Sequence, residues 1–418
     1  MCRRWRSEVA SGRASAVPTA APSGATAQIQ LPGRTPGSGP LVIPEPGWAA
    51  GYPPPARRKV FAAAHVAASP SPAAGGGGDP VIDWESTMRF RDHLWAHGFG
   101  VAEAMDTSQR GMGLPWEQAR ELIARTAARA ADAADAGRPR ALAAGAGTDQ
   151  LAAGEDHTLA GITGAYAEQT SFVQSAGAQV ILMASRALAA RARGPRDYLQ
   201  VYGELLKQAD QPVILHWLGE AFDPALRGYW GSTDFDAAAG TVLELIERAG
   251  GQVDGIKLSL LDAGQEVTLR RRLPSGVRLY TGDDFNYAGL IRGDADGYSD
   301  ALLGAFAAIT APAAAALAAL DQGDVAGYDA AMGPTVPLSR LIFEPPTYHY
   351  KVGVAFLAWL NGLQPHFAML AGLQRQRSAR HLIRVFELAA AARALTQPDL
   401  AVERMTAHLA RLAGPERV

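Results

Sequence analysis

The chain has 418 residues, of which 48% are hydrophobic and 19% are charged, a composition that fits a soluble globular protein with a large core. A net charge of −2 excludes the broad positive field that attracts nucleic acid or an anionic membrane, so we expect neither as a partner. The single cysteine, Cys2, excludes a disulfide framework and a cysteine-based metal site, and it fits a cytoplasmic location.

The first 57 residues are rich in Pro, Gly, Ala and Ser. Too few of them could bury a core, so residues 1–57 are predicted to form a largely disordered extension. Residues 28–31 and 41–44 fit short strands. The basic start of the chain is not followed by the continuous apolar segment of a secretory signal. A second flexible stretch is expected at residues 69–79.

From Val60 onward, short apolar runs alternate with helical patterns, which predicts strands separated by helices. The runs are almost continuously apolar, as expected for strands that are covered on both faces. The predicted strands are residues 60–66, 99–105, 141–145, 179–184, 212–217, 253–258, 277–280 and 298–306.

The intervening helices carry start and stop signals. Asp83 is expected to cap a helix that Gly98 ends, while Pro115 and Pro195 each stand at a helix start. Two more helices are predicted at residues 235–249 and 262–272. Residues 301–320 are apolar over a length that could span a bilayer, but most of them are alanine, so we interpret them as a strand followed by an alanine-rich helix.

Eight strand-helix units over about 250 residues predict a (β/α)8 TIM barrel at residues 58–320. The alternative, an open doubly wound sheet, usually has a glycine-rich phosphate loop after its first strand. Here that place reads Ala64-His65-Val66-Ala67, which favours the barrel. Residues 321–418 are predicted to form a C-terminal helical subdomain, with helices at 352–363, 378–395 and 398–412.

The predicted strand at residues 253–258 carries Lys257 near its C-terminal end. A buried ammonium without a partner costs several kcal/mol, or else its pKa falls until the amine is neutral. A neutral amine is a nucleophile that forms a Schiff base with a carbonyl. The alternative is a strand-end lysine whose ammonium group reaches solvent.

Barrel enzymes place their chemistry at the C-terminal ends of the strands. Polar side chains stand at the ends of the first seven predicted strands. In strand order they are His65; Glu103, Asp106, Thr107, Ser108 and Arg110; Asp149; Ser185 and Arg186; His216; Lys257 and Ser259; and Asp283 and Asp284.

Each of these residues also has a structural interpretation. A histidine at a strand end is often a hydrogen-bonded structural group, and Asp149 and Asp284 precede helical patterns that they could cap. Glu103 lies within an apolar strand, so its carboxylate needs a partner or a raised pKa, and Lys257 is one possible partner.

The segment Gly255-Ile256-Lys257, followed by Thr281-Gly282-Asp283-Asp284, resembles the dihydrodipicolinate synthase / N-acetylneuraminate lyase family. In that family a G-I-K strand carries the Schiff-base lysine and the next strand ends in S-G-D-D. Residues 144–147, Ala-Gly-Ala-Gly, are similar to the family's A-G-x-G on strand 3. Residues 343–351, which include Glu344 and Lys351, are similar to the segment that follows the barrel in this family. The resemblance covers residues 58–415 and is closest to an uncharacterised dihydrodipicolinate synthase-like branch.

The departures from the family pattern concern substrate recognition and proton transfer. The family's strand 2 ends in G-T-T-G-E, whereas residues 105–111 read Met-Asp-Thr-Ser-Gln-Arg-Gly. The proton-relay tyrosine of its strand 5 is replaced by His216, and the aromatic pair after its strand 4 is replaced by Ser185-Arg186. The resemblance therefore implies a class I aldolase barrel that is not a standard dihydrodipicolinate synthase.

The first hypothesis is a lyase or aldolase that acts on a small carbonyl compound, such as a 2-oxo acid, through an imine of Lys257 and without another cofactor. His216 would be the general acid/base. Arg186 or Arg110 would bind a substrate carboxylate through a bidentate pair, and Thr107 and Ser108 would donate to the same group. The family's members are commonly homo-oligomers, so we expect an oligomer here.

Two alternatives remain open. The first is a barrel enzyme that depends on a divalent metal, with ligands drawn from His65, Glu103, Asp106, His216 and Asp283. The second is a small-molecule-binding barrel that has lost its chemistry, because a fold does not fix a function.

Overall fold

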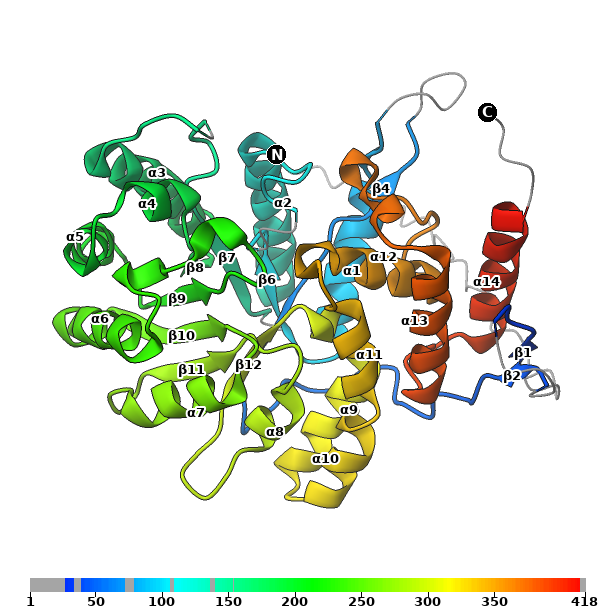
Figure 1. Cartoon of the computed structure of the whole chain (residues 1–418). Helices are drawn as coiled ribbons and strands as arrows, with labels where there is room; N and C mark the ends of the chain where they lie inside the picture. The colour runs from blue at the N-terminus through cyan, green and yellow to red at the C-terminus, as the bar shows by residue number, and fades with distance from the viewer. Residues whose placement is uncertain are drawn as a thin grey trace, which may run out of the picture.

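Eight parallel strands close into a barrel at the centre of the structure, a computed structural model that describes residues 27–33, 39–71, 79–105, 109–135, 140–152 and 154–413 (Figure 1). The strands follow chain order, and the last pairs with the first through Ala301 and Val60. The predicted TIM barrel is confirmed. Its strands are β3 (Val60–Ala63), β6 (Gly100–Glu103), β7 (Leu142–Ala146), β8 (Gln179–Leu182), β9 (Val213–Leu218), β10 (Val253–Ser259), β11 (Arg278–Thr281) and β12 (Asp300–Leu303).

Several strands end earlier than the apolar runs from which they were predicted. β6 ends at Glu103 because Ala104 takes a positive φ of 45°, which turns the chain out of the sheet. β12 ends at Leu303 because residues 305–307 form a 3-10 turn that is still buried. Burial continues past the end of the strand, so hydrophobicity alone overestimates strand length.

Alternate residues of the strands line the inside of the barrel. The inward cluster is separate from the larger cluster that packs under the helices, as the two-residue period of a strand requires. Its members are Phe61, Ala63, Ala102, Met105, Ala143, Ile181, Ile214, Tyr280 and Leu302.

Charged residues close the N-terminal end of the barrel. Lys59 lies 3.2 Å from Asp254, and the hydroxyl of Tyr280 donates to the same carboxylate at 2.5 Å. Arg278 pairs with Asp300 at 2.9 Å. These groups satisfy one another at the strand starts, which leaves the opposite end for chemistry.

Helices surround the barrel in the order that the sequence predicts. Asp83 caps the first by accepting the amide of Ser86 at 3.0 Å, and Pro195 is the first residue of the fifth. The surrounding helices are α1 (Trp84–Ala96), α2 (Trp116–Asp135), α3 (Leu159–Ser175), α4 (Arg186–Arg191), α5 (Pro195–Leu206), α6 (Phe235–Arg248), α7 (Ala263–Arg272) and α8 (Tyr287–Arg292).

The rest of the chain is helical, as predicted. Residues 301–320 form β12, a 3-10 turn and the first part of α9, and none of the described helices is long and apolar enough to cross a membrane. The remaining helices are α9 (Thr310–Asp321), α10 (Val325–Met332), α11 (Thr335–Ile342), α12 (Lys351–Leu360), α13 (Ala379–Ala391) and α14 (Pro398–Ala413). Every residue of α12 is buried.

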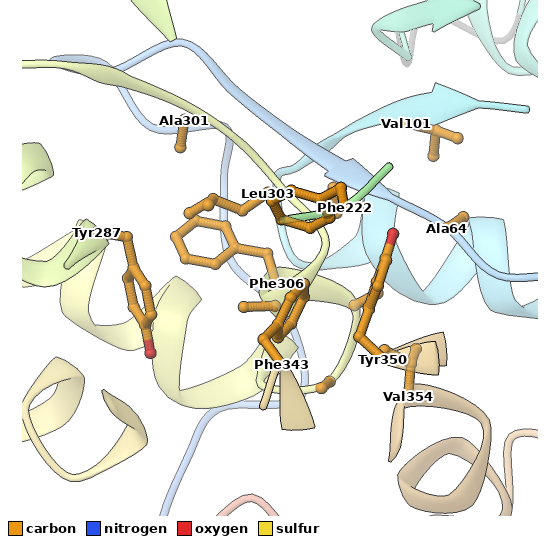
Figure 2. Packing of buried hydrophobic residues seen from close by; sticks show 14 of the residues in the cluster. Ala64, Val101, Phe222, Tyr287, Ala301, Leu303, Phe306, Phe343, Tyr350 and Val354 are labelled. Carbon is orange, nitrogen blue, oxygen red and sulfur yellow. The ribbon is translucent and has the colours of Figure 1, made fainter. Parts of the chain in front are cut away.

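Aromatic rings join the C-terminal helices to the barrel. Phe343 and Tyr350 stack at 4.2 Å, and Phe222, from the segment after β9, meets both of them edge to face. Figure 2 shows these rings beside Phe306, which follows β12. Rings of this size contribute much of the apolar area that a contact buries, so the subdomain is packed firmly against the barrel.

Part of the N-terminal region is also packed. The strands β1 (Gln28–Ile29) and β2 (Leu41–Val42) pair with each other and lie beside α14 (Figure 1). They bury Ile29, Leu31 and Ile43. A second short pair, β4 (Ala68–Ser69) with β5 (Val81–Ile82), precedes α1. The predictions for residues 1–26, 34–38 and 72–78 lie outside the described residues.

A buried carboxyl group lies between α7 and the barrel. Glu266 accepts hydrogen bonds from the hydroxyls of Thr281 at 2.9 Å and Ser299 at 2.7 Å. Burial is the main cause that raises the pKa of Glu266 to about 8. The folded protein therefore keeps this proton over a pH range in which the unfolded chain releases it.

Glu266 should make the free energy of unfolding depend on pH. Below about pH 4.5 both states hold the proton. Between that pH and about 8 only the folded state holds it, so the stability present in acid is lost as the pH rises. Relative to Glu266→Gln, we expect the wild type to lose a few kcal/mol between pH 5 and pH 8, measured by urea unfolding. Glu247→Gln, at an exposed position on α6, is the control. Parallel pH profiles for wild type and Glu266→Gln would contradict the assignment.

Candidate active site

Lys257 points into the barrel near the C-terminal end of β10. Its neighbours Ile256 and Leu258 belong to the outer cluster, so the alternation of the strand turns Lys257 inward. The residue is 5% exposed, and its Nζ lies 3.6 Å from the Sδ of Met105. The sequence-based prediction of a buried strand with an enclosed lysine is confirmed, and the interpretation of a lysine that reaches solvent is not.

Gly282 leaves the space that the side chain of Lys257 occupies. A Cβ at position 282 would lie 2.8 Å from the Cε of Lys257 and 2.1 Å from the Oγ of Ser259. Real Cβ atoms do not approach other atoms so closely, so position 282 requires Gly. Gly282 follows β11, which pairs with β10.

His216 lies directly beside Lys257. The two residues are Cα partners in the pairing of β9 with β10, and His216 is also buried. Its Nε2 lies 3.3 Å from the Oγ of Ser259, and its Nδ1 has no hydrogen-bond partner among the described residues. Burial, followed by the positive charge of Lys257, holds the pKa of His216 well below its ordinary value. At neutral pH the imidazole is therefore uncharged and able to accept a proton.

Arg110 is buried and fully engaged in the protein. It forms an ion pair with Asp149 and donates to the carbonyls of Ala104 at 3.1 Å and Gly145 at 2.8 Å. It also donates to Gln169 at 2.6 Å. Because these partners use its guanidinium, Arg110 holds the loops after β6 and β7 together. Its donors are occupied by protein groups, which does not favour the expected role in binding a substrate carboxylate, and Asp149 is its counterion and not a helix cap.

Glu103 lies on the outer side of β6. Its carboxylate takes two hydrogen bonds from Arg91, at 2.7 and 2.8 Å, and one from Thr126 at 2.8 Å. Since Ala102 lines the inside, the alternation of the strand turns Glu103 toward α1 and α2. Its partner is therefore Arg91, and not Lys257 as considered from the sequence.

The remaining predicted residues are dispersed. His65 shares a 2.7 Å hydrogen bond with Gln364 of the C-terminal subdomain, and burial is the main cause that lowers its pKa to about 3. Asp283 accepts the amides of Phe285 and Asn286 at the start of α8. Asp284 does not cap that helix, because it accepts the amide of Ala305 at 2.9 Å.

Among the described residues, no group of three or more His, Cys, Asp or Glu side chains could hold a metal ion. Three of the five ligands proposed from the sequence, His65, Glu103 and Asp283, have other partners. Asp106, Thr107 and Ser108 lie outside the described residues.

Two features were missed by the sequence analysis. Lys351, noted there only for its resemblance to the family, is buried and donates to the carbonyl of Ala63 at 2.7 Å, at the end of β3. A cavity of about 830 Å³ lies at the C-terminal ends of β7 and β8. Its lining includes Arg186 and Met183 but neither Lys257 nor His216. No pattern in the sequence indicated a cavity lined by segments that follow four different strands.

Comparison with known proteins places the chain in a family and identifies its fold. Residues 41–414 match the family model described as "Protein of unknown function (DUF993)". The chain belongs to this family. No curated protein matches it.

The chain is also similar to solved structures of dihydrodipicolinate synthases and related proteins. A prophage protein of that family from E. coli K12, solved in complex with pyruvate, has a TM-score of 0.60 at 15% identity, over 81% of this chain and 99% of that one. Dihydrodipicolinate synthase from Aquifex aeolicus gives 0.58 at 15% identity, over 81% and 99%. The Oceanobacillus iheyensis enzyme gives 0.57 at 17% identity, over 79% and 95%. The resemblance seen in the sequence is thus confirmed as a likeness of fold.

The placement of Glu103 predicts a structural role. Glu103→Gln leaves the buried Arg91 without its counterion, so we expect the free energy of unfolding to fall by about 3–5 kcal/mol. Glu121→Gln, which breaks the exposed pair with Arg125, should cost less than about 1 kcal/mol. Chemical denaturation of both variants measures the difference. Equal losses in the two variants would show that the buried pair contributes no more than the exposed one.

Proposed function

We propose that the protein is a lyase or aldolase that binds a small carbonyl substrate as an imine of Lys257. The observation that carries the proposal is the enclosed lysine beside an uncharged His216, with Ser259 in contact with that histidine. These are polar groups in a barrel interior that is otherwise apolar near them. Polar groups in an apolar interior reduce stability, which supports a role in chemistry.

The chemistry follows from these groups. Lys257 first loses the proton of its ammonium group to solvent, and the resulting amine attacks the carbonyl carbon while His216 carries a proton from the nitrogen to the carbonyl oxygen. Water leaves once solvent supplies a second proton, and an iminium ion remains. The iminium withdraws the electron pair of the neighbouring C–C bond, and that bond breaks or, in the reverse direction, forms. These steps need only side chains of the chain and protons exchanged with solvent.

The comparisons support the general class and leave the substrate to be determined. The solved structures with this fold include dihydrodipicolinate synthases and a protein in complex with pyruvate. This chain has His216 where the resembled family has its relay tyrosine, and Arg110 is occupied by Asp149. We therefore propose a substrate other than that of a standard dihydrodipicolinate synthase.

Borohydride trapping tests the proposal directly. The protein is incubated with 2-oxo acids and aldehydes, reduced, and weighed intact, because reduction makes an imine permanent. The chain has only four lysines, Lys59, Lys207, Lys257 and Lys351, so peptide mapping separates them. We expect one adduct, on Lys257, and none in Lys257→Ala. Lys207→Ala, at an exposed position, should be trapped like the wild type.

Two outcomes would contradict the Schiff-base assignment. One is an adduct that persists in folded Lys257→Ala at the wild-type level. The other is the absence of any adduct across the panel in folded wild-type protein. The second result would be followed by measurement of bound metal, since it would favour the metal-dependent alternative.

Ser259 is proposed as the residue that positions His216. With Ser259→Ala, the imidazole loses its partner at Nε2, so the rate of trapping at saturating substrate should fall about 10- to 100-fold. The half-saturating concentration should stay within about twofold, because Ser259 acts through His216 and not through the bound carbonyl. Ser175→Ala, on the surface of α3, is the control. A change in half-saturation with an unchanged maximal rate would refute this role.

A further inference from the structure

The 830 Å³ cavity lies beside the proposed active site but outside the barrel interior. Segments after β6, β7, β8 and β9 line it, and its polar lining includes Thr148, Ser185, Arg186 and Asp223. Its volume suits a small organic molecule. The chemistry of these side chains therefore determines which ligand the cavity can bind.

Arg186 is held so that part of its guanidinium faces the cavity. Its Nε donates to Asp223 at 2.5 Å, and the carboxylate of Asp223 is itself fixed by the amide of Ala225. The side chain of Arg186 is 51% exposed, whereas that of Asp223 is 6% exposed. Among the described residues the two terminal nitrogens of Arg186 make no hydrogen bond, which leaves two adjacent donors for a ligand.

The surroundings keep this pair of donors accessible. A Cβ at Gly111 would approach the Nη1 of Arg186 to 3.3 Å, so the glycine leaves space for the guanidinium. The hydroxyls of Thr148 and Ser185, 2.6 Å apart, add polar groups to the same wall. Arg110 also lines the cavity, but Asp149 neutralises it. Arg186 is therefore the group best placed to bind an anion there.

The charges at the cavity favour a carboxylate over a phosphate. The carboxylates of Glu155 and Asp156 are exposed at the cavity lining. They repel a doubly charged phosphate more strongly than a singly charged carboxylate. A planar carboxylate also matches the two parallel donors of an arginine.

One methionine lies next to Lys257, and a second methionine lines the cavity. Met105 contacts the lysine amine, and Met183 lines the cavity. Gly145 brings them together, because a Cβ there would lie 2.6 Å from the Sδ of Met183 and 2.8 Å from the Cα of Met105. Methionine side chains are flexible, so we infer that a substrate bound in the cavity can displace them and reach Lys257.

We propose that this cavity binds a carboxylate through Arg186, and that the carboxylate is the far end of the substrate whose carbonyl reacts with Lys257. The anion site stands on the cavity alone, whereas the substrate assignment rests on the proposed function. The substrate class is then an oxo compound with a carboxylate several atoms away from its carbonyl. Pyruvate, whose carboxylate is bonded directly to its carbonyl carbon, does not belong to this class.

Glutarate tests the anion site without imine chemistry, because this dicarboxylate has no carbonyl to react. We expect calorimetry to show binding to the wild type and to Lys257→Ala, and at least about tenfold weaker binding to Arg186→Gln. Arg191→Gln removes a charge from the same helix outside the cavity lining and should bind like the wild type. Equal binding to Arg186→Gln, no binding to the wild type, or tighter binding of inorganic phosphate would each overturn the assignment.

Trapping with 2-oxoglutarate and with pyruvate tests the substrate assignment. Arg186→Gln should raise the half-saturating concentration of 2-oxoglutarate about tenfold and leave that of pyruvate unchanged. Equal effects on both compounds would overturn the assignment. If glutarate binding depends on Arg186 but the wild type traps no carbonyl compound, the anion site stands, while the Schiff-base function and the substrate class both fail.

Discussion

The enclosure of one amine in the interior of a closed barrel is the constraint on which the site depends. Lys257 is held by β10, between a histidine on one neighbouring strand and a glycine after the other. The burial of His216 itself and, second, the positive charge of Lys257 hold the pKa of His216 below its ordinary value. The same enclosure that makes the lysine costly for stability thus keeps its neighbour uncharged at neutral pH.

The two ends of the barrel differ in the partners of their charged groups. At the N-terminal end, Lys59, Asp254, Arg278 and Asp300 pair with one another and leave no demand for a ligand. At the C-terminal end, charged groups are held by loops and by the C-terminal subdomain, as in the contact of Lys351 with the carbonyl of Ala63. An end built from loops can form a cavity, whereas an end closed by ion pairs cannot.

The sequence predicted the architecture well because the strands are buried on both faces and therefore stand out as apolar runs. Because both faces are apolar, however, the sequence does not indicate which face of the sheet each side chain occupies. Glu103 was grouped with Lys257 although it points outward to Arg91, since no polar alternation marked the inner side of β6. Arg110 and Arg186 looked equivalent in sequence. Only their partners in space, Asp149 and Asp223, show that one is engaged on all sides and the other is partly available.

The contact between the two ends of the chain has a consequence for biosynthesis. β1 lies against α14, and the indole of Trp48 donates to the carbonyl of Arg393 at 2.8 Å, across 345 residues of sequence. β1 and β2 are synthesised well before α14, against which β1 docks. At 5–20 residues per second, this segment waits roughly 20–70 s for its partner. During that interval its apolar residues are accessible to chaperones, and they lose this access only after α14 has been made.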